Sequence, residues 1–270
     1  MLRSVFLQIL FWWCISVTLL EAIPVRKTIR SYRMDPVSQE IQDQLVDFLS
    51  ELDMPNGGID WNFDLLPFED MCKVVGGTPR LQAPHYLILR AEKLNGCLQN
   101  SGFLGEMAVL WLTAQGIATC WQGGLELEND YDGVLPYIAA VGFGYSDEPF
   151  YTPGDNRKPS PLAKMAFGDI SGYKAGLIDA MGRAPSFRDE FPVRIYSEQY
   201  RIHFFRKKPA IQLPQLSYMA CIDVGVAAAH LNVAAQDAGY GVRYEKQQPE
   251  PVYRKKHKYQ FTALLSSYQV

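Results

Sequence analysis

The stretch GFLGEMAVLWLTAQGI, residues 102–117, decides the fold of this chain. It carries a single charge, Glu106, among sixteen apolar, small or polar residues. The bulky members Leu104, Met107, Leu110 and Trp111 cover more than one face of a helix, and no polar stripe separates them. This pattern predicts a long helix that is buried on most sides and therefore lies at the centre of the fold.

A second stretch of the same kind, the Ala-rich residues 223–238, follows in the other half of the chain. When Gly102 is set against Gly225, Gly116 falls on Gly239, so both copies read glycine, thirteen residues, glycine. The order helix, strand, strand, long buried helix, strand also recurs. We interpret the repeat as an internal duplication, with two halves that pack as a pseudo-dimer within one chain.

Periodicity and turn residues place the remaining elements. An amphipathic pattern predicts helices, and β-branched and aromatic runs between breakers predict strands. Expected helices are residues 19–23, 38–52 and 175–183, and expected strands are 61–68, 85–90, 137–143, 193–195, 201–206 and 259–265. We divide the chain into an apolar extension or anchor (1–17), a first half (18–165) and a second half (166–270).

Composition bounds the function. The chain has 270 residues, 48% of them hydrophobic, and a net charge of −3, which argues against nucleic acid as a partner. Five cysteines form no Cys-x-x-Cys pair, so we expect a reducing compartment and neither a disulfide framework nor a metal site. Four widely spaced histidines offer no ligand spacing, and we expect His230 to be packed or hydrogen-bonded within its helix.

The N-terminal residues 4–20 carry no charge and are strongly apolar. They fit a signal peptide, a short membrane anchor or an extension of the first helix. The flank after the run is more basic than the flank before it, which keeps the body of the protein cytoplasmic. We therefore rank an anchor or extension above export, and expect a cytoplasmic protein with membrane contact through residues 4–20.

Cationic and hydroxyl side chains cluster just after this run, in Arg26-Lys27-Thr28-Ile29-Arg30. Guanidinium forks, hydroxyls and backbone N–H groups at the end of a turn together suit a doubly charged phosphate monoester. A solvated basic patch is the competing interpretation.

Four stretches in this order resemble the FMN-dependent nitroreductase superfamily: RKTIR (26–30), GIATCWQGG (116–124), NRK (156–158) and APSFRDEFPVR (184–194). More narrowly, the chain is similar to a branch in which one internally duplicated chain takes the place of the usual homodimer. The resemblance covers roughly residues 18–245. It implies an α+β nitroreductase-like fold, with a mainly antiparallel sheet and a long buried central helix in each half.

The resemblance implies a site built from the first half. Arg26, Lys27 and Thr28 would hold the FMN phosphate, and Arg30 would reach the ribityl chain and the N1/C2-oxygen edge of the flavin. The backbone N–H of the Gly123–Gly124 loop would approach flavin N5, where a Cβ would obstruct it. A glycine loop that merely ends a helix is the alternative.

It also implies contributions from later in the chain. Arg157 and Lys158 would return to the phosphate, although a proline-rich surface loop carrying two cations is a competing interpretation. Pro185, Ser186 and Asp189 would reach across the flavin, as the matching segment does between subunits of a homodimer. Because the phosphate turn occurs only in half one and the Ala-Pro-Ser turn only in half two, we expect one composite pocket.

The last segment departs from the family pattern. Asp189 stands where the family has an asparagine, Phe191 replaces a glutamine and Val193 replaces a tryptophan. A carboxylate accepts from flavin N3–H but cannot donate to a flavin oxygen, and it opposes negative charge at N1. Phe187 and Phe191, with Trp61, are candidate walls of an aromatic pocket.

The implied function is an FMN-dependent oxidoreductase that acts as a single-chain pseudo-dimer on a small molecule. NADH or NADPH would pass hydride to flavin N5, and a nitroaromatic, a quinone or a similar acceptor would then take its place, in ping-pong turnover. No side-chain nucleophile is needed. The alternatives are a deiodinase-like reductive dehalogenase, a flavin-binding or membrane-tethered pseudoenzyme, and an unrelated α+β domain.

Overall fold

The computed structural model describes residues 17–123, 125–128, 135–152, 162–208, 213–247, 249 and 256–267. A first sheet contains β1 (Trp61–Pro67), β2 (His85–Ala91), β3 (Ala118–Gln122) and β4 (Tyr137–Gly144). Its strands lie in the order β1-β2-β4-β3, and every pair is antiparallel. β2 is buried along its whole length, which agrees with its run of apolar residues.

A second sheet comes from the other half of the chain. It contains β5 (Ala166–Gly168), β6 (Val193–Glu198), β7 (Arg201–Lys207), β8 (Tyr240–Glu245) and β9 (His257–Ser267). The order is β5-β6-β7-β9-β8, and only the short β5 pairs in parallel. When β5 is left out, the strand order β6-β7-β9-β8 matches the order β1-β2-β4-β3 of the first sheet.

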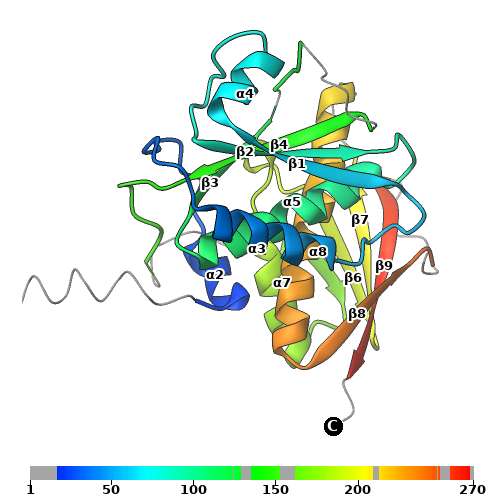
Figure 1. Cartoon of the computed structure of the whole chain (residues 1–270). Helices are drawn as coiled ribbons and strands as arrows, with labels where there is room; N and C mark the ends of the chain where they lie inside the picture. The colour runs from blue at the N-terminus through cyan, green and yellow to red at the C-terminus, as the bar shows by residue number, and fades with distance from the viewer. Residues whose placement is uncertain are drawn as a thin grey trace, which may run out of the picture.

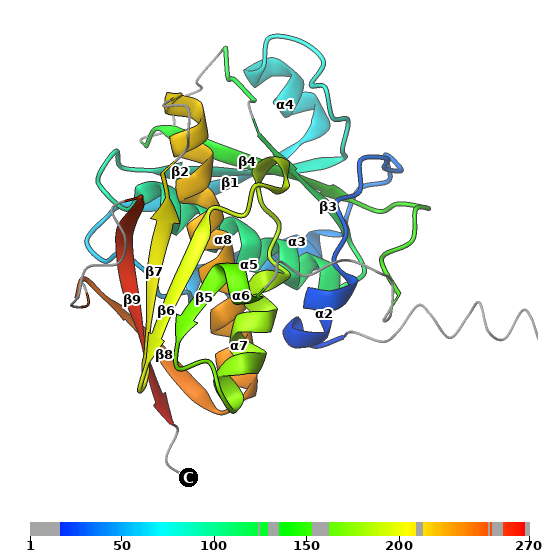
Figure 2. The ribbon, with the colours of Figure 1, turned by 180° about the vertical axis from the view of Figure 1, so that it is seen from behind.

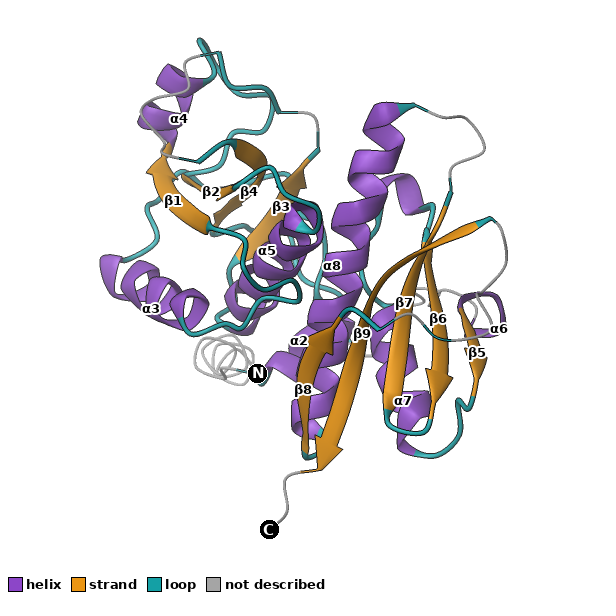
Figure 3. Ribbon diagram, turned by 90° about the vertical axis from the view of Figure 1, so that its right-hand side faces the viewer, coloured by secondary structure: helices purple, strands orange, loops and turns teal. Residues whose placement is uncertain are grey.

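Two long helices, α5 (Cys97–Ala114) and α8 (Pro214–Asp237), lie side by side between the two sheets (Figure 3). Buried side chains from both helices and both sheets form one continuous hydrophobic core. α8 is the single helix among the described residues that is long and apolar enough to cross a membrane, but 83% of its most apolar window is buried inside the protein. It is therefore explained by its place in the core.

The two central helices cross at a pair of glycines. A Cβ at Gly102 would lie 2.1 Å from the carbonyl oxygen of Ile222, and a Cβ at Gly225 would lie 1.9 Å from that of Gln99. Gly102 thus faces Ile222, three positions before Gly225, and Gly225 faces Gln99, three positions before Gly102. A two-fold relation between the helices requires such reciprocal contacts. The missing Cβ atoms allow the backbones to touch.

Shorter helices cover the remaining faces. They are α2 (Leu19–Val25), α3 (Gln39–Ser50), α4 (Phe68–Val74), α6 (Leu162–Met165), α7 (Tyr173–Gly182) and the 3-10 turn η2 (Phe187–Asp189). α2 starts at a capping box formed by Thr18 and Glu21, and Ser38 caps α3. α4 stands above the first sheet in the connection from β1 to β2 (Figure 1). In the second half, only residues 199 and 200 separate β6 from β7.

The α+β class and the antiparallel sheets are confirmed. The central helices begin earlier than expected, α5 by five residues and α8 by nine. The short elements α4, α6, β3, β5 and β8 were not expected, and β3 occupies part of the stretch interpreted as a glycine-rich loop. Nearly all of the apolar N-terminal run lies outside the described residues.

Candidate functional site

A cavity of about 870 Å³ opens where the two halves meet. This volume lies within the range of small-molecule sites, roughly 300–1,000 Å³. From the first half, residues after α2, before β2 and around β3 and β4 line the cavity. From the second half, the turn after α7 and one face of α8 line it. Lining residues include Thr28, Arg30, Arg80, Leu81, Trp121, Gln122, Gly123, Tyr137, Pro185, Ser186, Phe187, Arg188, Met219, Ile222 and Asp223.

The segment after α2 is fixed beside β3. Thr28 forms an isolated parallel bridge with Thr119, and the N–H of Ile29 donates to the Thr119 carbonyl at 3.1 Å. This pairing carries Thr28 and Arg30 to the cavity next to Gln122 and Gly123, at the end of β3. The chain leaving α2 passes beside β3 in Figure 2. Two of the sequence-predicted motifs thus come together.

The Ala-Pro-Ser turn reaches the same cavity from the second half. A Cβ at Gly123 would lie 3.4 Å from the Phe187 ring, so the two predicted loops touch. Within the turn, the N–H of Phe191 donates to the Ser186 hydroxyl at 3.0 Å. Arg188, Asp189 and Phe191 all have positive φ, a conformation that bulky residues rarely adopt. The turn is therefore held in a strained form at the edge of the cavity.

Asp223 on α8 is the side chain that holds this turn, and the sequence interpretation did not include it in the site. Its two carboxyl oxygens lie 3.1 and 3.2 Å from the Phe187 nitrogen, which donates to them. The side chain lines the cavity, yet the residue is only 6% exposed. Burial raises the pKa of Asp223 to about 7. A single acid at the start of an apolar stretch was the available signal.

Three exposed arginines, Arg30, Arg80 and Arg188, also line the cavity. None of them forms an ion pair with another described residue, and Arg188 lies over the Phe187 ring at 5.2 Å. Glu126 and Asp223 are the acidic lining residues. Guanidinium groups that form no ion pair among the described residues, beside aromatic and aliphatic walls, suit a planar ligand that carries an anionic group.

Three predicted site residues lie elsewhere. Arg26 is 3% exposed and pairs with Glu106 of α5 at 3.7 Å. Lys27 pairs with Glu148 at 2.7 Å and lies over the Tyr151 ring. Asp189 is exposed. None of the three lines the cavity, so its cationic groups and its buried acid come from other positions.

Other predicted positions fall outside what the structure describes. Gly124, Arg157 and Lys158 lie there, so their predicted roles stay predictions. Among the expected aromatic walls, Phe187 lines the cavity, whereas Trp61 stacks on Phe63 in β1, outside the lining. The cavity takes its other aromatic walls from Trp121, Tyr137 and Tyr218.

Glu106 lies at the centre of a buried polar network behind the cavity. Its carboxylate accepts from Trp121 Nε1 at 2.9 Å and lies 2.9 Å from His230 Nε2. The other nitrogen of His230 donates to the carbonyl of Ala180 at 2.9 Å, so a proton must also lie between Nε2 and Glu106. The histidine is hydrogen-bonded within the core, as expected. With Arg26, the network joins α2, α5, β3, α7 and α8.

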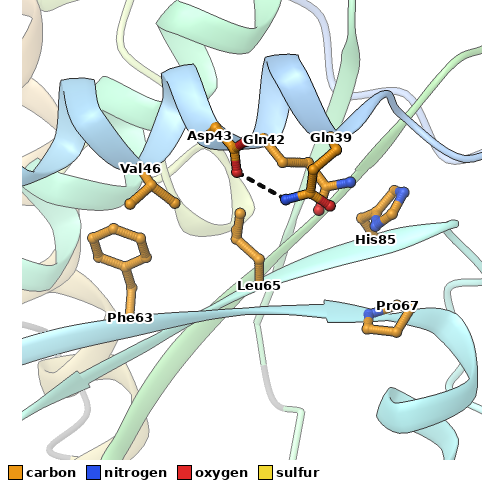
Figure 4. Close-up of a pocket in the computed structure, with 8 residues that line it drawn as sticks. All are labelled: Gln39, Gln42, Asp43, Val46, Phe63, Leu65, Pro67 and His85. Carbon is orange, nitrogen blue, oxygen red and sulfur yellow. Dashed lines mark hydrogen bonds between the residues drawn. The ribbon is translucent and has the colours of Figure 1, made fainter.

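A second cavity of about 540 Å³ lies between α3 and β1 (Figure 4). Its polar side chains are Gln39, Gln42, Asp43 and His85, and Gln39 donates to Asp43 at 2.8 Å. It has no lysine or arginine and none of the predicted site residues. The cavity between the halves is the better candidate for an anionic ligand.

Comparison with solved structures supports the fold. A protein from Thermotoga maritima described as "a putative nitroreductase" superposes with a TM-score of 0.62 at 20% identity, covering 93% of this chain and 94% of its own. An FMN-dependent nitroreductase from Clostridium difficile gives 0.42 at 18% identity, over 55% of this chain and 98% of its own. An FMN-dependent nitroreductase from Mycobacterium smegmatis in complex with NADPH gives 0.38 at 16% identity, over 47% and 86%.

The fold is therefore similar to that of the Thermotoga maritima protein along nearly the whole chain. The chain also matches, over residues 18–235, the model of a family described as "Putative TM nitroreductase". Because the match spans most of the sequence, the chain belongs to this nitroreductase family. No curated protein sequence matches it significantly.

Proposed function

We propose that this protein is an FMN-dependent oxidoreductase that transfers hydride from NADH or NADPH, through flavin N5, to a nitroaromatic, quinone or similar acceptor. The observation that carries the proposal is the convergence of three motifs, distant in sequence, on one cavity: Thr28–Arg30, Gln122–Gly123 and Pro185–Arg188. Bound flavin would supply the hydride chemistry, and the chain would bind and orient the reactants.

The lining residues fit each part of FMN. Thr28 and Arg30, fixed beside β3, would hold the phosphate and ribityl chain through a hydroxyl and a guanidinium group. The backbone at Gly123 would donate toward the ring, because no side chain stands between it and the cavity. Leu81, Met219 and Ile222 offer apolar contact to the rings.

We further propose that the chain is an internal duplication that retains one composite site. The matching strand orders and the reciprocal contacts of Gly102 and Gly225 support a two-fold relation between the halves. With these glycines aligned, residue 103 corresponds to 226 and residue 121 to 244. Because Trp121 pairs with Val141 and Tyr244 with Ala263, Ala139 corresponds to Phe261.

The position related to the cavity by this two-fold is filled. Phe103 stands where the cavity has Val226, and Phe261 stands where it has Ala139. Both phenylalanines are fully buried and pack edge-on against Tyr244, with ring centroids 6.0 and 5.4 Å away. Tyr244 corresponds to the cavity-wall residue Trp121, so we infer that Phe103 and Phe261 fill the space in which a second flavin would lie.

The first test is an absorbance spectrum of the purified chain, with released flavin quantified per polypeptide. We expect one FMN per chain, bleached by NADH or NADPH. Two per chain would refute the single site. Absence of flavin, even after incubation with excess FMN, would refute the flavin-dependent function and favour a non-catalytic role.

The cellular location stays a proposal. We propose that the folded body is cytoplasmic, with residues 4–20 as its membrane contact. Fractionation of cells that express the full chain, with and without residues 1–16, tests this: only the full chain should sediment with membranes.

A further inference from the structure

Asp223 has a counterpart in the other half that serves as an internal control. Under the alignment of Gly102 with Gly225, Asp223 corresponds to Asn100 on α5. Asn100 also holds a proline-containing turn that follows a helix. Its Oδ1 accepts from the backbone N–H of Asn56 at 2.9 Å, and its Nδ2 donates to the Asn56 carbonyl at 2.8 Å. A neutral amide is therefore sufficient to hold such a turn in this fold.

A carboxyl group at the same position has a cost that the amide avoids. Asp223 is 6% exposed, and no arginine or lysine forms an ion pair with it among the described residues. Removing a carboxylate from water without a cationic partner is unfavourable, so the protonated form is favoured. One difference between the two positions offers a reason for the acid: Asp223 lines the open cavity, whereas Asn100 is buried and does not line it.

The charged groups around Asp223 favour a retained proton. Glu106 on α5 and Glu190 after the 3-10 turn both raise the pKa of Asp223, in addition to burial, and only the Phe187 N–H lowers it. Arg188 lines the cavity from the same turn, and Tyr218 does so from α8. Farther around the lining are Arg30, Arg80 and Glu126. With a pKa of about 7, the carboxyl group exchanges its proton near neutral pH.

We propose that Asp223 is the proton donor to the acceptor bound in this cavity, a role that rests on the proposed hydride transfer. For a quinone, the hydride supplies one hydrogen and the electron pair. The O–H bond of Asp223 breaks and its proton passes to the acceptor oxygen, which gives the hydroquinone. The resulting carboxylate keeps its hydrogen bond from Phe187 and takes a proton back from water.

The decisive variant is Asp223→Asn, because an amide oxygen still accepts from Phe187. With menadione as acceptor, kcat of the wild type should fall as pH rises through about 7. In the variant, kcat should be lower by roughly 100-fold, the scale of general acid catalysis, and should not change with pH in this range. Flavin bound per chain should stay unchanged. Asp43→Asn, which removes an exposed carboxylate on α3, is the matched control and should behave as the wild type.

A second readout needs neither flavin nor turnover. Because the folded pKa of Asp223 lies above the unfolded one, the folded state binds an extra proton between pH 4 and 7. The contribution of Asp223 to the stability of the flavin-free wild type should therefore fall with rising pH across this window. In Asp223→Asn this contribution should be absent. The melting temperature of the variant minus that of the wild type should therefore increase from pH 4 to pH 7.

The outcomes separate the two proposals. Equal pH dependence of stability in wild type and variant would show that the carboxyl group holds no proton, and would overturn the donor role. So would unchanged kcat in Asp223→Asn. A wild type that binds flavin but reduces no acceptor would instead refute the proposed reductase, and the donor role would fall with it.

Discussion

Arg26 and Arg30 belong to one cationic cluster in the sequence, but they have different surroundings. Arg26 is buried against Glu106, and burial lowers its pKa while the carboxylate opposes the shift. Arg30 is exposed and lines the cavity. The turn that the sequence predicts as a phosphate clamp is thus divided between a core ion pair and a candidate ligand-binding group.

Because the two arginines have different surroundings, alanine variants at Arg30 and Arg26 should change different properties of the protein. Arg30→Ala should weaken FMN binding by about 10- to 100-fold, because one charge-assisted hydrogen bond contributes about 1.5–3 kcal/mol, with little change in melting temperature. Arg26→Ala should destabilise the fold by roughly 3 kcal/mol, because it removes the buried guanidinium group that pairs with Glu106. Flavin fluorescence titration and thermal unfolding measure the two effects.

Arg33→Ala controls for the loss of positive charge, since Arg33 is half-exposed and pairs with Asp35 at the surface. It should change neither quantity appreciably. Equal loss of FMN affinity in Arg30→Ala and Arg33→Ala would contradict a specific role for Arg30.

At the scale of elements, the crossing of α5 and α8 joins the two halves. It depends on Gly102 and Gly225, whose added Cβ atoms would meet backbone rather than a movable side chain. The crossing therefore also fixes the distance across the cavity, because α8 carries Asp223 and Met219 to it.

Gly225→Ala should destabilise the protein by about 3 kcal/mol or more, at or above the upper end of typical overpacking costs, because the backbones cannot separate without opening the core. Gly176→Ala is the matched control: it is a helical glycine in α7 with open space around its Cβ position. That change should stabilise by about 1 kcal/mol through helix propensity. Chemical denaturation measures both, and a neutral Gly225→Ala would show that the helices do not touch as described.

At the scale of the whole molecule, the two halves share one core and are expected to unfold together. All five tryptophans lie at or before position 121, so tryptophan fluorescence reports mainly on the first half. Far-UV circular dichroism reports on both halves, including α8. We expect coincident midpoints in thermal unfolding by the two probes. Separate midpoints would show that the halves are independent domains.

Some features of this fold could be predicted from the sequence, and others could not. The apolar composition of residues 102–117 and 223–238 is sufficient for two buried helices, because such segments are stable only when covered on all sides. Alternating or continuous apolar runs predicted β1, β2, β4, β6, β7 and β9. β3 and β8 were missed, because each follows a glycine that ends a helix, and that glycine predicts a loop as readily as a strand.

The candidate site was predicted in part. Thr28, Arg30, Gly123, Pro185 and Ser186 line the cavity as the motifs predict. Arg80 carried no local signal, since it lies in the connection that contains α4, and the signal for Asp223 was only that of a single acid at the start of an apolar stretch. Asp223 holds the backbone of Phe187, 36 positions away in the sequence, and Arg80 lines a cavity to which both halves of the chain contribute.

The sequence by itself determined the fold class, the repeated order of elements and the nitroreductase resemblance, because periodicity and short motifs are local properties of the chain. The tertiary structure alone decided which charged groups face the cavity and which are buried. It placed Arg26 on Glu106, Asp189 in solvent and Asp223 at the cavity wall. Burial and pairing depend on contacts between distant segments, and these contacts set the pKa and the chemistry of each side chain.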